Sequence, residues 1–172
     1  WEMPEITARI CGICPVSHQL AAAKALDEIA GVDLPDGAYK LRELLHMGQV
    51  LQSHALSFFY LSSPDLVLGY DADPSTRNIE GVLEENPELA ERGIDLRSFG
   101  QDVIAALGDK KVHPDFAIGG GVTNTLDREA GEALLDQSDD LDTYVRETID
   151  LLQDIFEGMD EDTLDYATYS TG

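Results

Sequence analysis

The chain has 172 residues, 43% of them hydrophobic, and a formal net charge of −23 at pH 7, values that exclude a disordered or collagen-like chain. Two cysteines three positions apart exclude a disulfide framework, and no apolar run approaches the roughly 20 residues of a membrane span. Because so acidic a surface repels nucleic acids and anionic lipids, we expect a globular, cytoplasmic protein with no nucleic-acid or membrane partner.

The first thirty residues carry one clear helix signal. Residues 1–5 begin without Met and show no basic region before an apolar stretch, so we expect no leader here and a piece of a longer protein. Pro15 suits a first helical position, apolar residues follow at helical spacing, and Gly31 suits a C-terminal stop. These signals predict a helix over 15–30.

A longer helix and a short one are predicted next. Asp36 can cap a helix over 37–61, which the Ser-Ser-Pro sequence after it would end. Asp73 and the proline that follows it are typical of an N-cap and first helical position, and they predict a short helix that ends near Asn86.

Two further helices are predicted around Gly93. Residues 87–92 form a short helix that this glycine would stop. Asp95 can then cap a helix with a periodic apolar face, closed by Gly108.

The last third of the chain divides into a loop, a helix and a tail. His113-Pro114 and the glycines at 119–121 predict a loop over 110–122, with the glycine run a loop constraint and no phosphate-binding loop, since it lacks a preceding strand and a lysine. Residues 127–158 return to helical spacing, whereas 160–172 are acidic and weakly patterned. The fold class is therefore predicted to be mainly α.

The acidic residues gather toward the C-terminal end. Residues 127–172 hold 15 acids and 2 bases, a net charge of −13, so we divide the chain into a core at 1–126 and an acidic helical segment at 127–172. A solvated acidic segment explains this skew. Adaptation to high salt explains it better, because the whole chain has 20 Asp against 4 Lys and dissolved ions screen carboxylate repulsion.

The chemistry-bearing residues lie at 9–18, which read Arg-Ile-Cys-Gly-Ile-Cys-Pro-Val-Ser-His. Spacings of three and four bring Cys11, Cys14 and His18 toward one face at a helix start. A helix N-terminus and the Arg9 guanidinium both favour thiolate, the form that binds soft metals, and Gly12 permits a tight turn between the thiols. The spacing predicts half of a metal site.

A Cys-x-x-Cys pair alone leaves other interpretations open. A thioredoxin-like redox pair needs a preceding strand, and a closed structural zinc site needs two further ligands. His46, His54 and His113 lie on separate segments, and we assign His46 and His54 no role. Two buried thiols without a function are as frequent as a site on spacing alone. The acidic residues near the C-terminus lack the pattern of a calcium loop.

The full string resembles the first cysteine motif, RxCGxCxxxH, of the large subunit of nickel-iron hydrogenases. Further matches run through about residues 6–125 and are similar to the cytoplasmic, NAD(P)-linked branch of that family. They include Gln19-Leu20-Ala21-Ala22, Leu41-Arg42-Glu43-Leu44, Gly48-Gln49-Val50-Leu51-Gln52-Ser53-His54, Ser62-Ser63-Pro64-Asp65-Leu66, Arg77-Asn78 and Phe99-Gly100-Gln101. The resemblance implies a helical large-subunit-like fold, present here as an incomplete fragment.

The resemblance also implies roles for individual residues. Cys11 would be a terminal nickel ligand, and Cys14 would bridge nickel to an iron that carries carbon monoxide and cyanide. His18 would donate a hydrogen bond toward a cysteine sulfur and tune its basicity. Arg9 of the motif is a further candidate catalytic residue, and Asp65 would pair with an arginine from the C-terminal half of the large subunit, which this fragment lacks. An equally weighted alternative is that Ser63 and Asp65 only cap a helix that begins at Pro64.

The implied activity is reversible oxidation of dihydrogen, with electrons passed to NAD(P) through partners. Those partners would be diaphorase-type subunits, with iron-sulfur clusters and flavin, together with an iron-sulfur small subunit. The family's second cysteine pair and its proton-transfer glutamate have no match in this sequence, so two of four nickel-binding sulfurs would come from elsewhere and the chain alone would be inactive.

Two other functions compete with the hydrogenase. One is the structural scaffold formed by the related quinone-pocket subunit of respiratory complexes, which lacks the nickel cysteines. The other is a small zinc-dependent interaction module. Retention of Cys11 and Cys14 weighs against the first, and the matches far from the cysteines weigh against the second.

Overall fold

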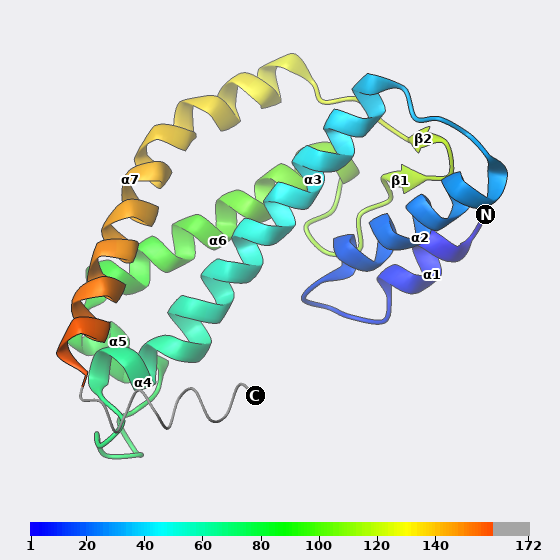
Figure 1. Cartoon of the computed structure of the whole chain (residues 1–172). Coiled ribbons are helices and arrows are strands. Elements are labelled where there is room, and N and C mark those ends of the chain that lie inside the picture. Colours follow the sequence, from blue (N-terminus) through cyan, green and yellow to red (C-terminus); the bar gives the residue numbers. More distant parts are fainter. Residues whose placement is uncertain (160–172) are drawn as a thin grey trace.

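The computed structural model describes residues 1–159, and nearly all of its elements are helices (Figure 1). They are α1 (Met3–Ala8), α2 (Pro15–Ala30), α3 (Asp36–Ala55), the π-helix η1 (Leu56–Ser62), α4 (Ser63–Leu68), α5 (Ile79–Glu85), α6 (Pro87–Gly108), β1 (Ala117–Ile118), β2 (Gly121–Val122) and α7 (Arg128–Gly158). The predicted fold class, mainly α, is confirmed. In this part of the chain no helix is both long and apolar enough to cross a membrane.

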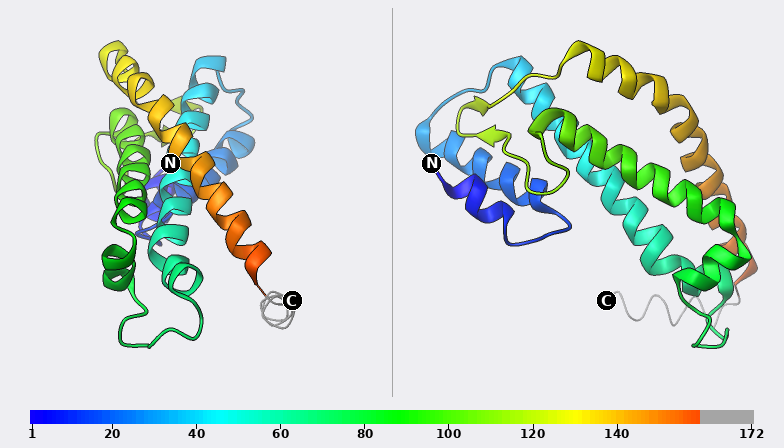
Figure 2. Two further views of the ribbon diagram at one scale, coloured as in Figure 1. Left: turned by 90° about the vertical axis from the view of Figure 1, so that its left-hand side faces the viewer. Right: turned by 180° about the vertical axis from the view of Figure 1, so that it is seen from behind.

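The antiparallel helices α3 and α6 lie side by side and form the spine of the molecule, with α7 along their outer side (Figures 1 and 2). At one end α1, α2 and the two-stranded antiparallel hairpin β1–β2 pack together, and one buried cluster joins α2, α3, α6 and β1. At the other end a second cluster joins α3, η1, α6 and α7. The motif at 9–18 thus lies on a small helical layer held against the spine.

Two predicted helices have the expected bounds. Helix α2 spans Pro15–Ala30 and ends at Gly31, which adopts φ 63°. Helix α7 follows Asp127, whose carboxylate accepts the backbone N–H groups of Glu129 and Ala130. Because α7 packs into the same cluster as η1 and α6, it shares their core, and a boundary after residue 126 stays a prediction. The tail at 160–172 lies outside the described residues.

The predicted stop after residue 61 is wrong, because the chain continues through η1 into α4. In the π-helical register Ser63 N–H donates to the Phe58 carbonyl, so the next donor should come from Pro64, which has none. The Ser63 hydroxyl supplies it by donating to the Phe59 carbonyl at 2.6 Å. The expected Asp36 cap is also absent: Pro35 is the N-cap and no side chain caps α3.

The helix predicted to begin at Asp73 begins later. The Asp73 carboxylate accepts the Ser75 N–H and hydroxyl, both at 2.8 Å, and closes a local turn without a helix. Helix α5 starts at Ile79, where the Asn78 side chain accepts the N–H groups of the first turn.

The two helices predicted around Gly93 are one helix, α6. A Cβ at Gly93 would lie 2.5 Å from Cβ and Cγ of Phe59, so the glycine allows η1 to pack against the middle of α6. Close approach explains this residue, and Asp95 caps nothing because it lies inside the helix.

Two short elements had no counterpart in the prediction. Helix α1 precedes the cysteine motif, and the loop predicted at 110–122 contains the hairpin β1–β2. Gly120 turns this hairpin with φ 82°, which a side chain would disfavour, so the glycine run is a backbone constraint as expected.

Candidate metal centre

The turn before α2 brings the two thiols and one imidazole together. Cys14 is the N-cap residue of α2, and its Sγ lies 2.7 Å from Sγ of Cys11, with both cysteines free. This separation is below the roughly 3–4 Å expected for two thiolates on one metal. The ligand atoms of Cys11, Cys14 and His18 all lie within 4.8 Å of one another. Two sulfur donors and one imidazole nitrogen therefore converge on one point.

The two sulfurs have different proton affinities. Cys11 Sγ accepts the Cys14 thiol, the Cys14 N–H at 3.2 Å and the Ile13 N–H at 3.4 Å, and these hydrogen bonds lower the pKa of Cys11. For Cys14, the hydrogen bond to Cys11 and partial burial raise the pKa. The pair therefore ionises first at Cys11, while Cys14 keeps its proton.

Arg9 and Gly12 do not act as predicted in the turn. The Arg9 guanidinium donates to the Glu5 carbonyl at 2.6 Å and is not among the groups that lower the pKa of Cys11. Backbone N–H groups at the start of α2 have that effect instead. Gly12 has no positive φ, and a Cβ there would meet no atom within 4 Å, so the turn does not require glycine.

Two glutamines of α3, for which no role was predicted, contact the turn. Gln49 and Gln52 are both buried, and each donates its amide to the Ile13 carbonyl, at 2.9 and 2.8 Å. Their spacing of three places them on one face of α3. Amides on the apolar face of a helix are a signal that sequence alone could have supplied, because buried polar groups need partners.

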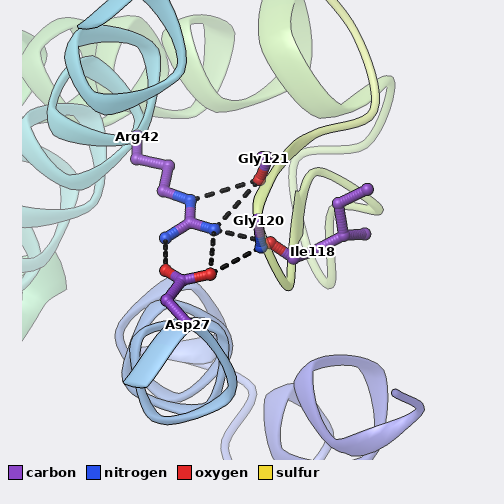
Figure 3. A network of polar contacts seen from close by, with 5 residues as sticks. All are labelled: Asp27, Arg42, Ile118, Gly120 and Gly121. Carbon is purple, nitrogen blue, oxygen red and sulfur yellow. Dashed lines mark hydrogen bonds and ion pairs between the residues drawn. The ribbon is translucent and has the colours of Figure 1, made fainter. Parts of the chain in front are cut away.

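A buried ion pair fixes the other end of α2 (Figure 3). Arg42 of α3 donates to both carboxylate oxygens of Asp27, at 2.6 and 3.4 Å, and to the carbonyls of Ile118 and Gly121. Asp27 also accepts the Gly120 N–H at 2.6 Å. Burial favours the neutral acid, but the bonds from Arg42 and Gly120 outweigh it and lower the pKa of Asp27. The network holds α2, α3 and the hairpin together.

Asp65 lies on α4, apart from the thiol cluster in sequence, and pairs within this chain. Its carboxylate lies 3.4 Å from Nε of Arg77, and both side chains are partly exposed. No side chain caps α4, so the alternative in which Ser63 and Asp65 cap that helix is wrong. Among the described residues, the group placed closely enough to hold a metal ion consists of Cys11, Cys14 and His18.

The donor set suits a nickel-iron centre in part. Convergent cysteine sulfurs are ligands for soft or borderline metals, and the lowered pKa of Cys11 favours its thiolate, the form that binds them. The sequence contains two cysteines, so the chain supplies at most two of four thiolates.

Comparison with known proteins also matches this chain to hydrogenases. Residues 2–78 match the family model described as nickel-dependent hydrogenase. The chain is 45% identical over 156 residues to a vhu-type F420-non-reducing hydrogenase chain of Methanocaldococcus jannaschii, covering 91% of this chain and 37% of that protein. It is 44% identical over 160 residues to the beta chain of the NAD-reducing hydrogenase HoxS of Cupriavidus necator, covering 90% and 33%.

Solved structures show the same likeness. An NAD+-reducing [NiFe]-hydrogenase in the H2-reduced state superposes with a TM-score of 0.89 at 48% identity, covering 92% of this chain and 35% of that one. The Ni-Fe-Se hydrogenase of D. vulgaris Hildenborough superposes with a TM-score of 0.71 at 25% identity, covering 84% and 32%. The chain therefore spans about a third of the length of the relatives it matches.

Proposed function

Because this chain belongs to the nickel-dependent hydrogenase family, we propose that it supplies two thiolates, from Cys11 and Cys14, to the nickel-iron centre of a hydrogenase large subunit. The observation that carries the proposal is the convergence of both sulfurs and the His18 ring at the start of α2. The complete subunit would oxidise dihydrogen reversibly.

When bound, a nickel-iron centre supplies the cleavage of dihydrogen into protons and electrons. The chain's own part is to hold and prepare the ligands. Two backbone N–H groups donate to Sγ of Cys11 and favour its thiolate, and the proton that Cys14 Sγ donates to Cys11 must leave when a metal binds. Helix α2 fixes the position of Cys14 through its N-terminus, and the proline after it starts that helix.

His18 is proposed to donate a ring N–H toward a cysteine sulfur, one turn into α2. His18→Gln in the complete enzyme should leave nickel content near wild type and lower kcat by about 10- to 100-fold, as expected for a hydrogen-bond partner of a ligand. Metal analysis and dihydrogen uptake on the same preparation measure both. Unchanged uptake with normal nickel would reduce His18 to a packing residue.

We propose NAD(P) as the final electron acceptor of the whole protein, and an NAD-reducing hydrogenase among the relatives supports this proposal. Diaphorase-type subunits with flavin and an iron-sulfur small subunit would carry the electrons to it, as the family resemblance implies. The iron would carry carbon monoxide and cyanide.

Large apolar side chains exposed at Ile10, Leu61 and Leu135 offer surface for neighbouring segments. The acceptor NAD(P) is consistent with a cytoplasmic location. Arg9 and Asp65 remain candidate catalytic residues.

The acidic surface is proposed to be an adaptation to high salt. The melting temperature of the full-length protein should rise steeply from dilute to molar KCl, because the Debye length falls from about 10 Å at 0.1 M to about 3 Å at 1 M. A variant with Asp136, Asp139 and Asp140 of α7 changed to Asn should show a smaller rise. Calorimetry across the KCl series measures both slopes. If the melting temperatures of both proteins stayed constant across the KCl series, the acidic surface would be only a solvated segment and not an adaptation to salt.

Two alternatives stay distinguishable from the hydrogenase. A zinc module needs a fourth ligand, and within residues 1–159 the cluster has three potential donors. A quinone-pocket scaffold does not need converging thiols. The proposal is tested by dihydrogen-dependent reduction of a redox dye by the purified complex that contains the full-length subunit. Dye reduction that depends on dihydrogen supports it, and a metal-loaded complex without such reduction contradicts it.

A further inference from the structure

The strongest feature outside the proposed ligands is the contact between α3 and the backbone of the cysteine turn. Gln49 and Gln52 donate to one acceptor, the Ile13 carbonyl, so both lone pairs of that oxygen have a partner. The two side chains are 2% and 5% exposed, which makes these bonds buried and directional.

The Ile13 carbonyl belongs to the same peptide group as the Cys14 N–H, which contacts the Cys11 sulfur. The Ile13 carbonyl and the Cys14 N–H lie in one rigid plane and point in opposite directions. That N–H donates to Sγ of Cys11 at 3.2 Å. Fixing the oxygen with two amides therefore fixes the direction of the N–H, and donation to a carbonyl also strengthens donation by the N–H of the same peptide.

An unpaired buried oxygen of Gln49 is the cost of this arrangement, and it supports a specific role for that residue. The Oε1 atom of Gln49 is buried and has no hydrogen-bond partner in the described structure. Turning that amide over would place its oxygen against the Ile13 oxygen, so the side chain keeps its donor on the turn and leaves its own acceptor unpaired. An apolar side chain at position 49 would leave no acceptor unpaired, so the cost of the buried Gln49 Oε1 points to a role for its donor on the turn.

Close packing behind α3 holds the glutamines in place. A Cβ at Gly100 of α6 would lie 2.7 Å from the backbone N of Gln52 and 2.7 Å from the Gly48 carbonyl oxygen. Helix α6 thus backs α3 directly at the position from which Gln52 reaches the turn, and α3 has little freedom to move away from α2.

We propose that Gln49 and Gln52 are positioning residues that act on the Cys11 sulfur through the Ile13–Cys14 peptide group. This inference rests on the proposed function for its effect on turnover, but the positioning itself concerns only residues of this chain. Because the two amides share one acceptor, either alone keeps the carbonyl paired. Removing both amides should therefore affect turnover and Cys14 amide exchange by more than the two single effects combined.

The test compares Gln49→Met, Gln52→Met and the double variant in the complex that contains the full-length subunit. Gln19→Met is the matched control: Gln19 is equally buried and bonds the backbone of Pro114 and Ala117, away from the thiols. The readouts are amide hydrogen exchange at Cys14 in metal-free protein, kcat and KM for dihydrogen, nickel content, and the infrared bands of the diatomic ligands on iron.

We expect each single variant to change kcat by less than about 3-fold, and the double variant to lower it by about 10- to 100-fold at unchanged KM, with shifted infrared bands. Cys14 amide exchange should rise at least about 10-fold in the double variant. Gln19→Met should lower the melting temperature similarly and leave these readouts as in wild type. If this double variant fails to fold, Gln49→Glu combined with Gln52→Met, which keeps both side chains near their original size but lacks both amide donors, should still accelerate Cys14 exchange.

Two results separate the inference from the function on which it rests. Wild-type Cys14 exchange in the double variant, or changes equal to those of Gln19→Met, would overturn the positioning role even in an active hydrogenase. Faster exchange in a complex that binds no nickel would support the positioning role and contradict the proposed function.

Discussion

Replacing Arg42 by methionine should lower the free energy of unfolding by about 3–5 kcal/mol, the usual cost of removing one partner of a buried ion pair. The guanidinium donates to the Asp27 carboxylate and to two hairpin carbonyls at once, and its loss leaves a buried carboxylate without a cationic partner, held by the Gly120 N–H. Urea unfolding followed by circular dichroism measures the change.

Two further variants show whether the loss of stability comes from the broken buried ion pair. Arg128→Met removes an exposed pair with Glu132 and should cost less than about 1 kcal/mol. The double variant Asp27→Leu with Arg42→Met removes both buried charges and should regain much of the loss, because no carboxylate is left unpaired. A cost for Arg42→Met no greater than that for Arg128→Met would contradict the account.

The same pair makes stability depend on pH in one direction. The pKa of Asp27 is lower in the folded protein than its ordinary value of 3.8, so the folded state holds its proton more weakly than the unfolded state. The stabilisation is fully present above about pH 4 and is lost as pH falls through the folded pKa. Asp27→Asn should flatten this acid-side decline, as urea midpoints between pH 2 and 6 would show.

Local sequence signals predicted the helices whose ends depend on local chemistry. Pro15 and Gly31 delimit α2 because a proline suits a first turn and a glycine adopts φ 63° at its end. Helix α7 was predicted from the helical spacing of its apolar residues, and its start is also fixed locally, by the Asp127 carboxylate that caps the first turn. The convergence of the two cysteines and His18 follows equally from spacing at a helix start.

Contacts between distant segments account for the failures. Gly93 has the sequence signature of a stop, but Phe59 of a different helix occupies the space a side chain would need. The Ser-Ser-Pro stop fails because Ser63 supplies the donor that Pro64 lacks. The approach of Phe59 to Gly93 joins residues 34 positions apart and is not visible in a window of neighbouring residues, whereas the Ser63 bond is local but depends on the π-helical register of η1. The roles of Gln49 and Gln52 were missed because their acceptor is also distant, 36 and 39 positions away.

The largest functional effect is expected from Cys14→Ser in the complete enzyme. It should lower dihydrogen uptake by more than about 100-fold, because even partners that only hydrogen-bond a ligand cost 10- to 100-fold and this residue is proposed to be a ligand itself. A serine hydroxyl is a poor ligand for soft metals, and it removes the sulfur that lies 2.7 Å from Cys11. Dye reduction under dihydrogen measures the loss.

A matched histidine variant controls for general damage. His54 is exposed on α3, its Nδ1 bonds the Val50 carbonyl one turn earlier, and it belongs to no cluster of potential ligands among residues 1–159. His54→Gln should therefore keep wild-type uptake. Retained uptake in Cys14→Ser would contradict the ligand assignment.

Metal analysis of the purified full-length subunit tests the central claim most directly, namely that Cys11 and Cys14 form half of a nickel-iron centre. The account predicts about one nickel and one iron per subunit in the wild type, with nickel lost in Cys14→Ser, because soft thiolates hold that metal. Zinc alone, or no bound metal, in a correctly folded wild-type subunit would contradict it.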